Sequence, residues 1–222
     1  MAPTYFAPCG GPIWRFSSAH YFGALAATDD RSPLSAGLPP TPAVSHTGAI
    51  ATSTDTRPPL SDDDAMALAL VEARAAAAEG EVPVGAVTVV DGRVVAARHN
   101  ERERTGDPTA HAELLALRDT AVAIGGWRLS DVSLVVTLEP CPMCAGALVA
   151  ARVGRLVFGA SDPRAGSCGT LYNLCADPRL NHELPVTEGL RAAECGALLS
   201  TFFAQKRNDR ASAGTSGAGQ ND

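Results

Sequence analysis

The first regular hydrophobic pattern begins near residue 61 and predicts a helix followed by a β-hairpin. Residues 61–64 (Ser-Asp-Asp-Asp) place a capping hydroxyl and first-turn acids before Ala- and Leu-rich sequence, so a helix is expected to about residue 79. Residues 84–90 are β-branched and apolar, Asp91-Gly92 is a tight-turn dipeptide, and a second apolar stretch covers residues 93–97. This arrangement is typical of two antiparallel strands joined by a short turn.

Helical and strand patterns alternate through the rest of the chain. Further helices are predicted over residues 108–124, 142–151 and 188–210, and further strands over residues 132–138 and 155–159 and near Val186. Alternation of strands with helices implies parallel neighbours, beside the antiparallel hairpin. The predicted fold class is therefore α/β: a three-layer αβα arrangement in which a mixed five-stranded sheet has helices on both faces.

Composition divides the chain into three parts. Residues 1–60 hold nine of the 16 prolines and follow no helical or strand pattern, which indicates a disordered extension or a start codon assigned too far upstream; a small docking segment is a third interpretation. Residues 61–210 are predicted to form one domain. Residues 211–222 are rich in Ala, Ser and Gly and are predicted to be a flexible tail.

The overall composition is that of a soluble globular protein, with 45% hydrophobic and 19% charged residues. No window approaches the roughly 20 continuous apolar residues of a membrane span. The N-terminus has no basic start followed by an apolar run, so neither export nor membrane insertion is expected. A cytoplasmic location is predicted, where the six cysteines would be thiols or metal ligands rather than disulfides.

The net charge of −6 argues mildly against a nucleic-acid partner, because phosphate binding usually uses a basic surface. The charges are unevenly distributed along the chain, however. Residues 61–81 hold six acids and one base, residues 152–179 hold four arginines and two acids, and Lys206, Arg207 and Arg210 follow near the C-terminus. A local basic face is therefore compatible with the acidic total, and ordinary solvated surface charges are the alternative interpretation.

Two short segments carry residues with catalytic chemistry: residues 109–113 (Thr-Ala-His-Ala-Glu) and residues 139–144 (Glu-Pro-Cys-Pro-Met-Cys). Cys141 and Cys144 are three residues apart, so on the first turn of a helix both sulfurs can approach one ion. His111 supplies a nitrogen ligand from the start of the preceding helix. Three protein ligands leave one tetrahedral position open for water, which is the arrangement of a catalytic zinc ion rather than a structural one.

Glu113 is the residue that makes the predicted metal site an enzyme. It follows His111 by two positions and is expected to shuttle protons from the attacking water to the ring nitrogen and to the departing amine. A Cys-x-x-Cys pair alone would equally fit structural zinc or a redox pair. The whole pattern, His-x-Glu followed about 30 residues later by Pro-Cys-x-x-Cys, is typical of zinc-dependent nucleobase deaminases.

Beyond these motifs, the chain resembles the bacterial tRNA-specific adenosine deaminases, a branch of the cytidine deaminase-like superfamily. The matching stretches lie on both sides of the zinc motif, at residues 81–86, 100, 107–113, 137–147, 157–160, 181–182, 187–189, 202–203 and 206–207. The resemblance implies hydrolysis of adenosine to inosine at position 34, the wobble position of a tRNA anticodon. It also implies an arginine tRNA as the typical substrate and a homodimer with one zinc ion per subunit.

The resemblance assigns a role to individual residues as well. Zinc would be bound by His111, Cys141 and Cys144, with Glu113 as the catalytic proton shuttle. The pocket for the flipped adenine would be formed by Asn100, Val82 and Pro83. The anticodon loop would be contacted by Asp162, Arg164, Phe202, Phe203, Lys206 and Arg207.

Several of these residues also have a purely structural interpretation. Asn100 can be explained as the cap of a turn after the hairpin, and Phe202 and Phe203 as core residues of the last helix. Glu139 is expected to bond backbone amides or a neighbouring chain rather than to do acid–base work. Two other functions stay open: a deaminase of free bases or nucleosides such as guanine or cytosine, and a zinc-stabilised RNA-binding protein without turnover.

Overall fold

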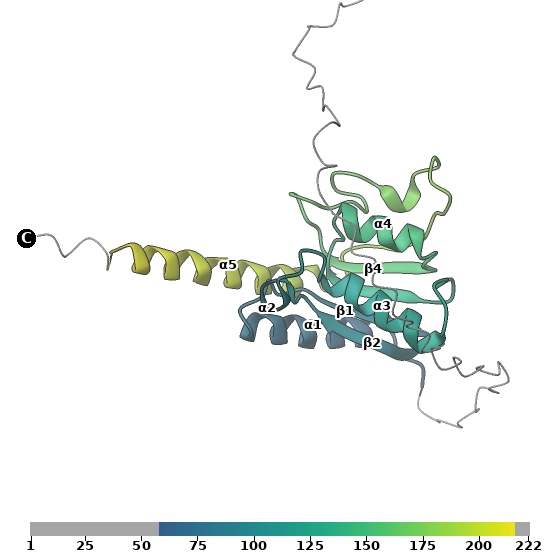
Figure 1. The fold of residues 1–222 in the computed structure, drawn as a ribbon, viewed down its shortest axis with the longest axis horizontal. Coiled ribbons are helices and arrows are strands. Elements are labelled where there is room, and N and C mark those ends of the chain that lie inside the picture. The colour runs from purple at the N-terminus through teal and green to yellow at the C-terminus, as the bar shows by residue number, and fades with distance from the viewer. Residues whose placement is uncertain (1–57, 216–222) are drawn as a thin grey trace, which may run out of the picture. The chain divides into compact units, whose positions relative to one another are not determined.

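One five-stranded sheet forms the centre of the structure. The computed structural model describes residues 58–215, with side chains described to residue 212. The strands are β1 (Gly85–Val90), β2 (Arg93–His99), β3 (Ser133–Leu138), β4 (Arg155–Ala160) and β5 (Val186–Thr187), in the order β2-β1-β3-β4-β5 (Figure 1). β1 is antiparallel to β2 and β3, whereas β3, β4 and β5 are parallel. The predicted mixed five-stranded sheet is therefore confirmed.

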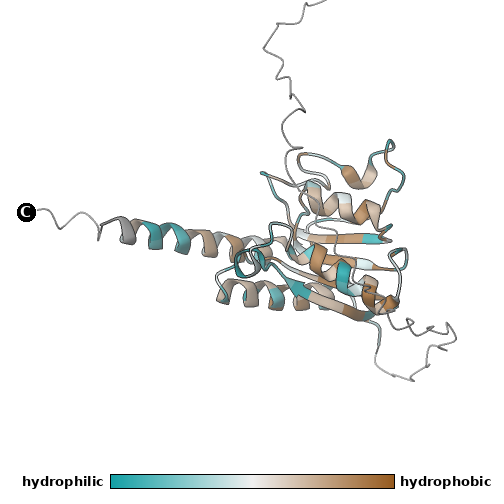
Figure 2. Ribbon diagram, viewed as in Figure 1, coloured by the Kyte–Doolittle hydropathy of each residue, from teal (hydrophilic) through white to brown (hydrophobic). Residues whose placement is uncertain are grey.

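Helices cover both faces of this sheet. The long ones are α1 (Asp62–Ala78), α3 (Ala112–Ile124), α4 (Pro142–Ala150) and α5 (Ala192–Thr215). Leu134 and Phe158 pack in one hydrophobic cluster with α3 and α4, whereas Val135 and Val157 pack in a second cluster with α1 and the start of α5. Strands buried on both faces are apolar at successive positions, which accounts for the hydrophobic central strands in Figure 2. The predicted three-layer αβα fold is confirmed.

The helix predicted over residues 108–124 begins later, at Ala112. Asp107 Oδ1 accepts hydrogen bonds from the backbone N and the hydroxyl of Thr109, at 2.8 and 2.7 Å, which closes a turn before the helix. Pro108 lies within this turn. His111 is then the N-cap residue, in an extended conformation with φ −79° and ψ 147°. The histidine is thus fixed at the point where the chain enters α3.

The last helix also differs from its prediction. It begins at Ala192 rather than near residue 188, because Gly189 and Arg191 have φ angles of 82° and 53°, in the left-handed region that an α-helix excludes. It continues to Thr215, beyond the predicted end at residue 210. Two short elements were not predicted, α2 (Arg102–Thr105) and the 3₁₀ turn η1 (Leu174–Ala176), because neither is long enough for a hydrophobic period to appear.

Most of the two predicted terminal segments falls outside the described residues. The predicted extension lies outside them up to residue 57, and the predicted tail from residue 216. The domain boundaries at residues 61 and 210 stay predictions. Within residues 58–215, no helix combines the length and the apolar character needed to cross a membrane.

Candidate active site

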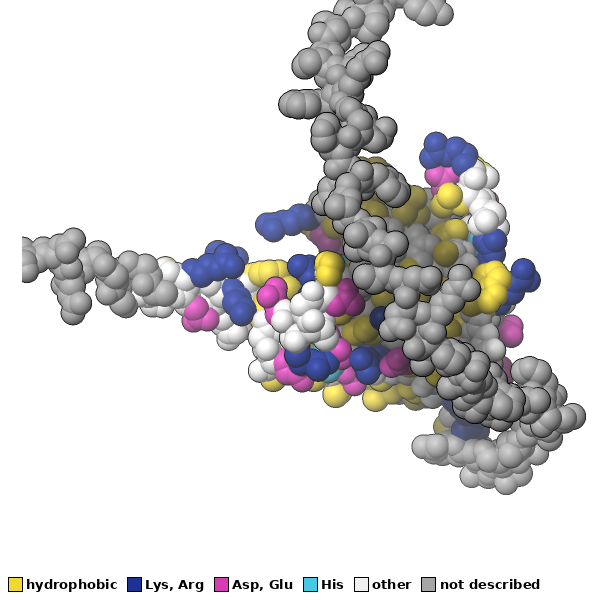
Figure 3. Space-filling view, viewed as in Figure 1, with side chains coloured by type: hydrophobic (Ala, Val, Ile, Leu, Met, Phe, Trp, Pro, Cys, Tyr) yellow, Lys and Arg dark blue, Asp and Glu magenta, His cyan; other side chains and the backbone are white. Residues whose placement is uncertain are grey.

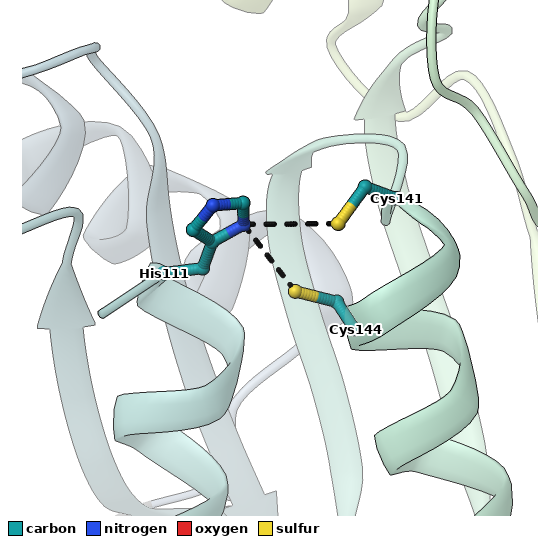
Figure 4. A group of neighbouring side chains, drawn as sticks. All are labelled: His111, Cys141 and Cys144. Atoms are coloured by element: carbon teal, nitrogen blue, oxygen red, sulfur yellow. Dashed lines mark hydrogen bonds between the residues drawn. The ribbon is translucent and has the colours of Figure 1, made fainter. Parts of the chain in front are cut away.

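Three candidate metal ligands meet between the starts of α3 and α4. His111 is the N-cap of α3, Cys141 is the N-cap of α4, and Cys144 lies in the first turn of α4 (Figure 4). His111 Nδ1 lies 3.7 Å from Cys141 Sγ and 3.5 Å from Cys144 Sγ, and the ligand atoms all lie within 4.8 Å of one another. The fold therefore brings the ligands predicted from the sequence to one point.

These distances fit a tetrahedral zinc site. Bonds of about 2.0 Å from zinc to nitrogen and about 2.3 Å to sulfur, at a tetrahedral angle, place the nitrogen and sulfur atoms about 3.5 Å apart. The N–S separations of 3.5 and 3.7 Å agree with that value. One imidazole and two thiols are also donors that zinc prefers, and three ligands leave a fourth position for a reactant.

The pKa values of the two thiols in this cluster are shifted in opposite directions. A hydrogen bond from Cys144, and to a smaller extent one from His111, lowers the pKa of Cys141 to about 4. The same hydrogen bond raises the pKa of Cys144, and burial raises it further. Hydrogen bonding to Cys141 also raises the pKa of His111. The lowered pKa of Cys141 favours its thiolate form, which is the form of cysteine that binds a divalent cation.

Glu113 lies in the first turn of α3, next to these ligands. It is 4% exposed, and burial raises the pKa of its carboxyl group above the usual range. Glu113 lines a cavity of about 160 Å³ together with His111 and Cys141. A carboxyl group with a raised pKa beside the reacting atoms is suited to both accepting and releasing a proton.

Further residues predicted from the sequence lie in the wall of this cavity, namely Asn100, Val82 and Asp162. Pro83 is buried but does not line the cavity. Arg164 is exposed outside the wall, where its backbone N donates to Asp162 Oδ1 at 2.9 Å. The structure therefore brings three of these five residues to the cavity, whereas Pro83 and Arg164 do not line it.

Four residues of the cavity wall were not predicted from the sequence: Val84, Arg102, Leu138 and Ala165. Val84 belongs to the apolar run before β1, so its sequence context suggests only a buried strand residue. Arg102 is exposed on α2, two residues after Asn100. Its position near Asn100 was the only available signal, because α2 itself was not predicted.

Glu139 also lines the cavity, but its oxygens are bonded to the loop that follows β4. They accept hydrogen bonds from the backbone N of Asp162, Cys168 and Thr170, each at 3.0 Å, and from the hydroxyl of Thr170. Burial alone would raise the pKa of Glu139, but these hydrogen bonds together lower it. A Cβ atom at Gly166 would lie 2.2 Å from Glu139 Oε2, so glycine is required for this close approach. The prediction that Glu139 bonds backbone amides is confirmed.

A second depression, which we call the α5 groove, adjoins the cavity. It has a volume of about 550 Å³, and Val82 lines both the groove and the cavity. Its other lining residues are Glu79, Gly80, Glu103, Phe202, Phe203, Lys206, Arg207 and Arg210. Basic side chains gather along the outer part of α5 (Figure 3). The four α5 residues predicted to contact RNA thus lie together in one groove.

The two phenylalanines of the α5 groove have different environments. Phe202 is 7% exposed, whereas Phe203 is 45% exposed. Their rings meet edge to face with centroids 5.4 Å apart, and Lys206 Nζ lies 5.4 Å from the centroid of the Phe202 ring. Phe202 therefore combines a packing role with a place in the groove, and Phe203 presents its ring to solvent.

Comparison with known proteins identifies the family. Residues 60–211 match the model of the MafB19-like deaminase family. The tRNA-specific adenosine deaminase of Bacillus subtilis (strain 168) is 47% identical over 152 residues, which are 68% of this chain and 94% of that protein. The chain belongs to the tRNA-specific adenosine deaminase family. The tRNA-specific adenosine deaminase of Haemophilus influenzae is also 47% identical, over 67% of this chain and 87% of the relative.

Solved structures of deaminases share the fold. A tRNA:A34 deaminase that performs A-to-I editing at the wobble position of transfer RNA is 44% identical, with a TM-score of 0.59 over 61% of this chain and 98% of that chain. The guanine deaminase of Nitrosomonas europaea has the same TM-score of 0.59 at 26% identity, over 67% of this chain and 87% of that chain. As a member of the tRNA-specific adenosine deaminase family, the chain is a hydrolytic deaminase with the predicted cytidine deaminase-like fold.

Proposed function

We propose that this chain deaminates adenosine to inosine at position 34, the wobble position of a tRNA anticodon. The strongest support is the group of three candidate zinc ligands, of which His111 and Cys141 line one small cavity together with the buried Glu113 carboxyl. This cavity adjoins a groove with basic and aromatic side chains. The relatives that match this chain over most of their own length are named tRNA-specific adenosine deaminases. Because the ribosome uses tRNA in the cytoplasm, we propose a cytoplasmic location, and we assign the activity to a domain at residues 61–210.

His111, Cys141 and Cys144 would hold one zinc ion per chain. When bound, zinc acts as a Lewis acid that makes water a competent nucleophile at neutral pH. Metal analysis tests this assignment: we expect about one zinc per chain in the purified protein. Cys141→Ser should lose most of the zinc and the activity together, because it removes one of three ligands. Retention of full zinc in that variant would contradict the ligand set.

Glu113 would act as the general base and general acid of the reaction. Hydrolysis consumes one water molecule, forms a bond from oxygen to C6 of adenine and breaks the bond from C6 to N6, which releases ammonia. The Glu113 carboxylate would accept one proton from the attacking water and deliver it to N1 of the ring. It would then accept the second proton from the new hydroxyl group on C6 and deliver it to the departing N6 amine. Because Glu113 is only 4% exposed, solvent competes little for these protons.

The adenine would enter the cavity from a single-stranded anticodon loop, which requires no opening of a duplex. Asn100 would hydrogen-bond the base, and Val82 and Val84 would contact its faces. Pro83 would restrict the backbone between these two valines, because its ring fixes φ. This division of roles is consistent with the cavity lining, in which both valines and Asn100 take part.

The RNA around the adenine would bind along the α5 groove. The exposed ring of Phe203 is suited to stacking on a base, and Lys206 and Arg207 are suited to contacting phosphates. Asp162 and Arg164, beside the cavity, would contact ribose and phosphate. Arg164, Lys206 and Arg207 supply the positive charges that the net charge of −6 does not suggest.

We further propose that the enzyme is a homodimer and that an arginine tRNA is its typical substrate, as its resemblance to the family implies. An exposed apolar depression between α3 and α4 supports the dimer; it is lined by Leu114, Leu117, Arg118, Ala121, Trp127, Leu129, Ala147, Ala150 and Ala151. Trp127 is 58% exposed, and clustered apolar surface of this kind marks interfaces.

Light scattering after size-exclusion chromatography tests the proposed dimer. Trp127→Glu should produce monomers, because it places a charge in the apolar depression. The matched control is Val122→Glu: Val122 is 82% exposed and does not line the depression, so this variant should stay dimeric. An unchanged mass for Trp127→Glu would reject this surface as the interface.

An anticodon stem-loop with adenosine at position 34 tests the proposed activity. We expect inosine in the stem-loop and no turnover of free adenosine, guanine or cytidine. Turnover of free guanine would instead support the alternative function, a deaminase of free bases. Guanine is included because a guanine deaminase of similar fold is 26% identical to this chain. Binding of the stem-loop without turnover would support a non-catalytic RNA-binding protein.

A further inference from the structure

Glu81 is a buried carboxylate that the proposed mechanism does not use. It lies between α1 and β1 and is 1% exposed. Its Oε1 accepts a hydrogen bond from the backbone N of Arg104 at 2.7 Å, and its Oε2 accepts one from Asn100 Nδ2 at 2.9 Å. Glu81 therefore joins the segment before β1 to the residue after β2 and to α2.

The hydrogen bond to Glu81 determines the orientation of the Asn100 side-chain amide. A carboxylate only accepts hydrogen bonds, so the amide nitrogen of Asn100 faces Glu81 and the amide oxygen points away from it. The backbone of Asn100 is held as well, because its N donates to Val84 O at 3.1 Å. Asn100 lines the cavity with Glu113 and is 5% exposed. A cavity residue is thus fixed in both position and orientation.

We propose that Glu81 is a positioning residue that sets the preference of the cavity for adenine. With one N–H bonded to Glu81, the Asn100 amide still offers its oxygen and its second N–H. An asparagine amide pairs with adenine in this order, accepting from the N6 amino group and donating to N7. Guanine and hypoxanthine carry an oxygen at C6, which cannot donate to the amide oxygen. This inference rests on the proposed function, since it assumes that adenine is the base bound.

The hydrogen bond from Arg104 to Glu81 explains why a glutamine at position 81 would reverse the Asn100 amide. The backbone N–H of Arg104 cannot be reversed, so it requires an acceptor from residue 81. A glutamine in place of Glu81 has one oxygen, which Arg104 would occupy, and its NH2 group would then face Asn100. Asn100 would have to turn its own oxygen toward that NH2 group. The order of donor and acceptor in the cavity would be reversed.

The variant Glu81→Gln tests this role on two stem-loops, with adenosine or 7-deazaadenosine at position 34. The second base lacks the N7 acceptor. For the unsubstituted protein we expect kcat/KM to be about tenfold lower on 7-deazaadenosine, which is the effect of one lost hydrogen bond. Glu81→Gln should lower kcat/KM on adenosine by about 10- to 100-fold. It should then turn over the two substrates at rates within about twofold, because the N7 contact is already absent.

A matched control separates positioning from general stabilisation. Glu72→Gln makes the same chemical change on α1, at a carboxylate that lies 2.7 Å from His99 Nδ1 and does not line the cavity, so it should keep activity and the preference for adenosine. If Glu81→Gln retains the full preference for adenosine over 7-deazaadenosine, Glu81 only supports the fold and the proposal is wrong.

A second variant keeps the test decisive if Glu81→Gln does not fold. Asn100→Ala removes the amide itself, so it must also lose the preference for adenosine over 7-deazaadenosine. Retention of that preference would overturn the proposal. Failure of the unsubstituted protein to form inosine from the adenosine stem-loop would instead overturn the proposed function, so the two failures are distinguishable.

Discussion

Functional residues are positioned differently in the cavity lined by Glu113 and in the α5 groove. At the cavity, His111 and Cys141 are helix caps and Glu113 is buried in a first turn, with the third candidate ligand, Cys144, buried in the first turn of α4. In the groove, Phe203, Lys206 and Arg207 are exposed on a single helix. Metal coordination and proton transfer require positions held to within a few tenths of an ångström, whereas contacts to an RNA loop tolerate adjustment. The cavity should therefore determine kcat, and the groove should determine KM.

Glu113→Ala should have the largest effect, because the cavity then lacks its proton shuttle. We expect kcat to fall by about 10³- to 10⁴-fold, near the upper limit of general acid–base catalysis. Zinc content and the KM for the stem-loop should stay within about twofold, since Glu113 is not a ligand and does not line the α5 groove. Steady-state kinetics and metal analysis measure both quantities. If substantial activity survives, the assignment of Glu113 is wrong.

Glu139→Gln should have an intermediate effect, on stability more than on chemistry. The amide replaces a carboxylate that accepts hydrogen bonds from Asp162, Cys168 and Thr170, and its NH2 group would face donors. We expect the free energy of unfolding to fall by about 1.5–3 kcal/mol, the range for hydrogen bonds to a charged group. Urea denaturation monitored by circular dichroism measures this change. Unchanged stability combined with lost activity would mean that Glu139 takes part in chemistry.

Replacing both Lys206 and Arg207 by alanine should have the smallest effect and should act on binding alone. We expect KM for the stem-loop to rise about tenfold with kcat unchanged, because exposed phosphate contacts contribute to affinity only. The slope of log Kd against log salt concentration should decrease in magnitude by about 1.4, which corresponds to two phosphate contacts with a single strand. A decrease in kcat with an unchanged salt slope would break the division between cavity and groove.

The fold was largely predictable because its strands have simple patterns. Buried strands such as β3 and β4 are continuous apolar runs, and the turn at Asp91-Gly92 identifies the hairpin. The start of α3 was placed too early because Pro108 is also a common first residue of a helix; here the side chain of Asp107 closes a turn instead. The start of α5 was misplaced because Arg191 adopts a positive φ that its residue type does not favour.

The candidate ligands were predictable because they belong to compact motifs, whereas the residues that hold the cavity in shape were not. Glu81 and Asn100 are 19 positions apart, and their hydrogen bond forms only after β1 and β2 have paired. Glu139 was expected to bond backbone amides, but its partners lie 23 to 31 residues later, in a loop without a regular pattern. Such contacts depend on tertiary structure, and single-residue propensities do not contain them.

The most direct test of the account uses whole tRNA rather than a fragment. The purified protein is incubated with an unmodified arginine tRNA that carries adenosine at position 34, and inosine is located by reverse transcription, which reads it as guanosine. The account predicts conversion at position 34 and at no other adenosine, with ammonia released in equal amount. Conversion at any other adenosine, or no conversion by a protein that contains zinc, would contradict it.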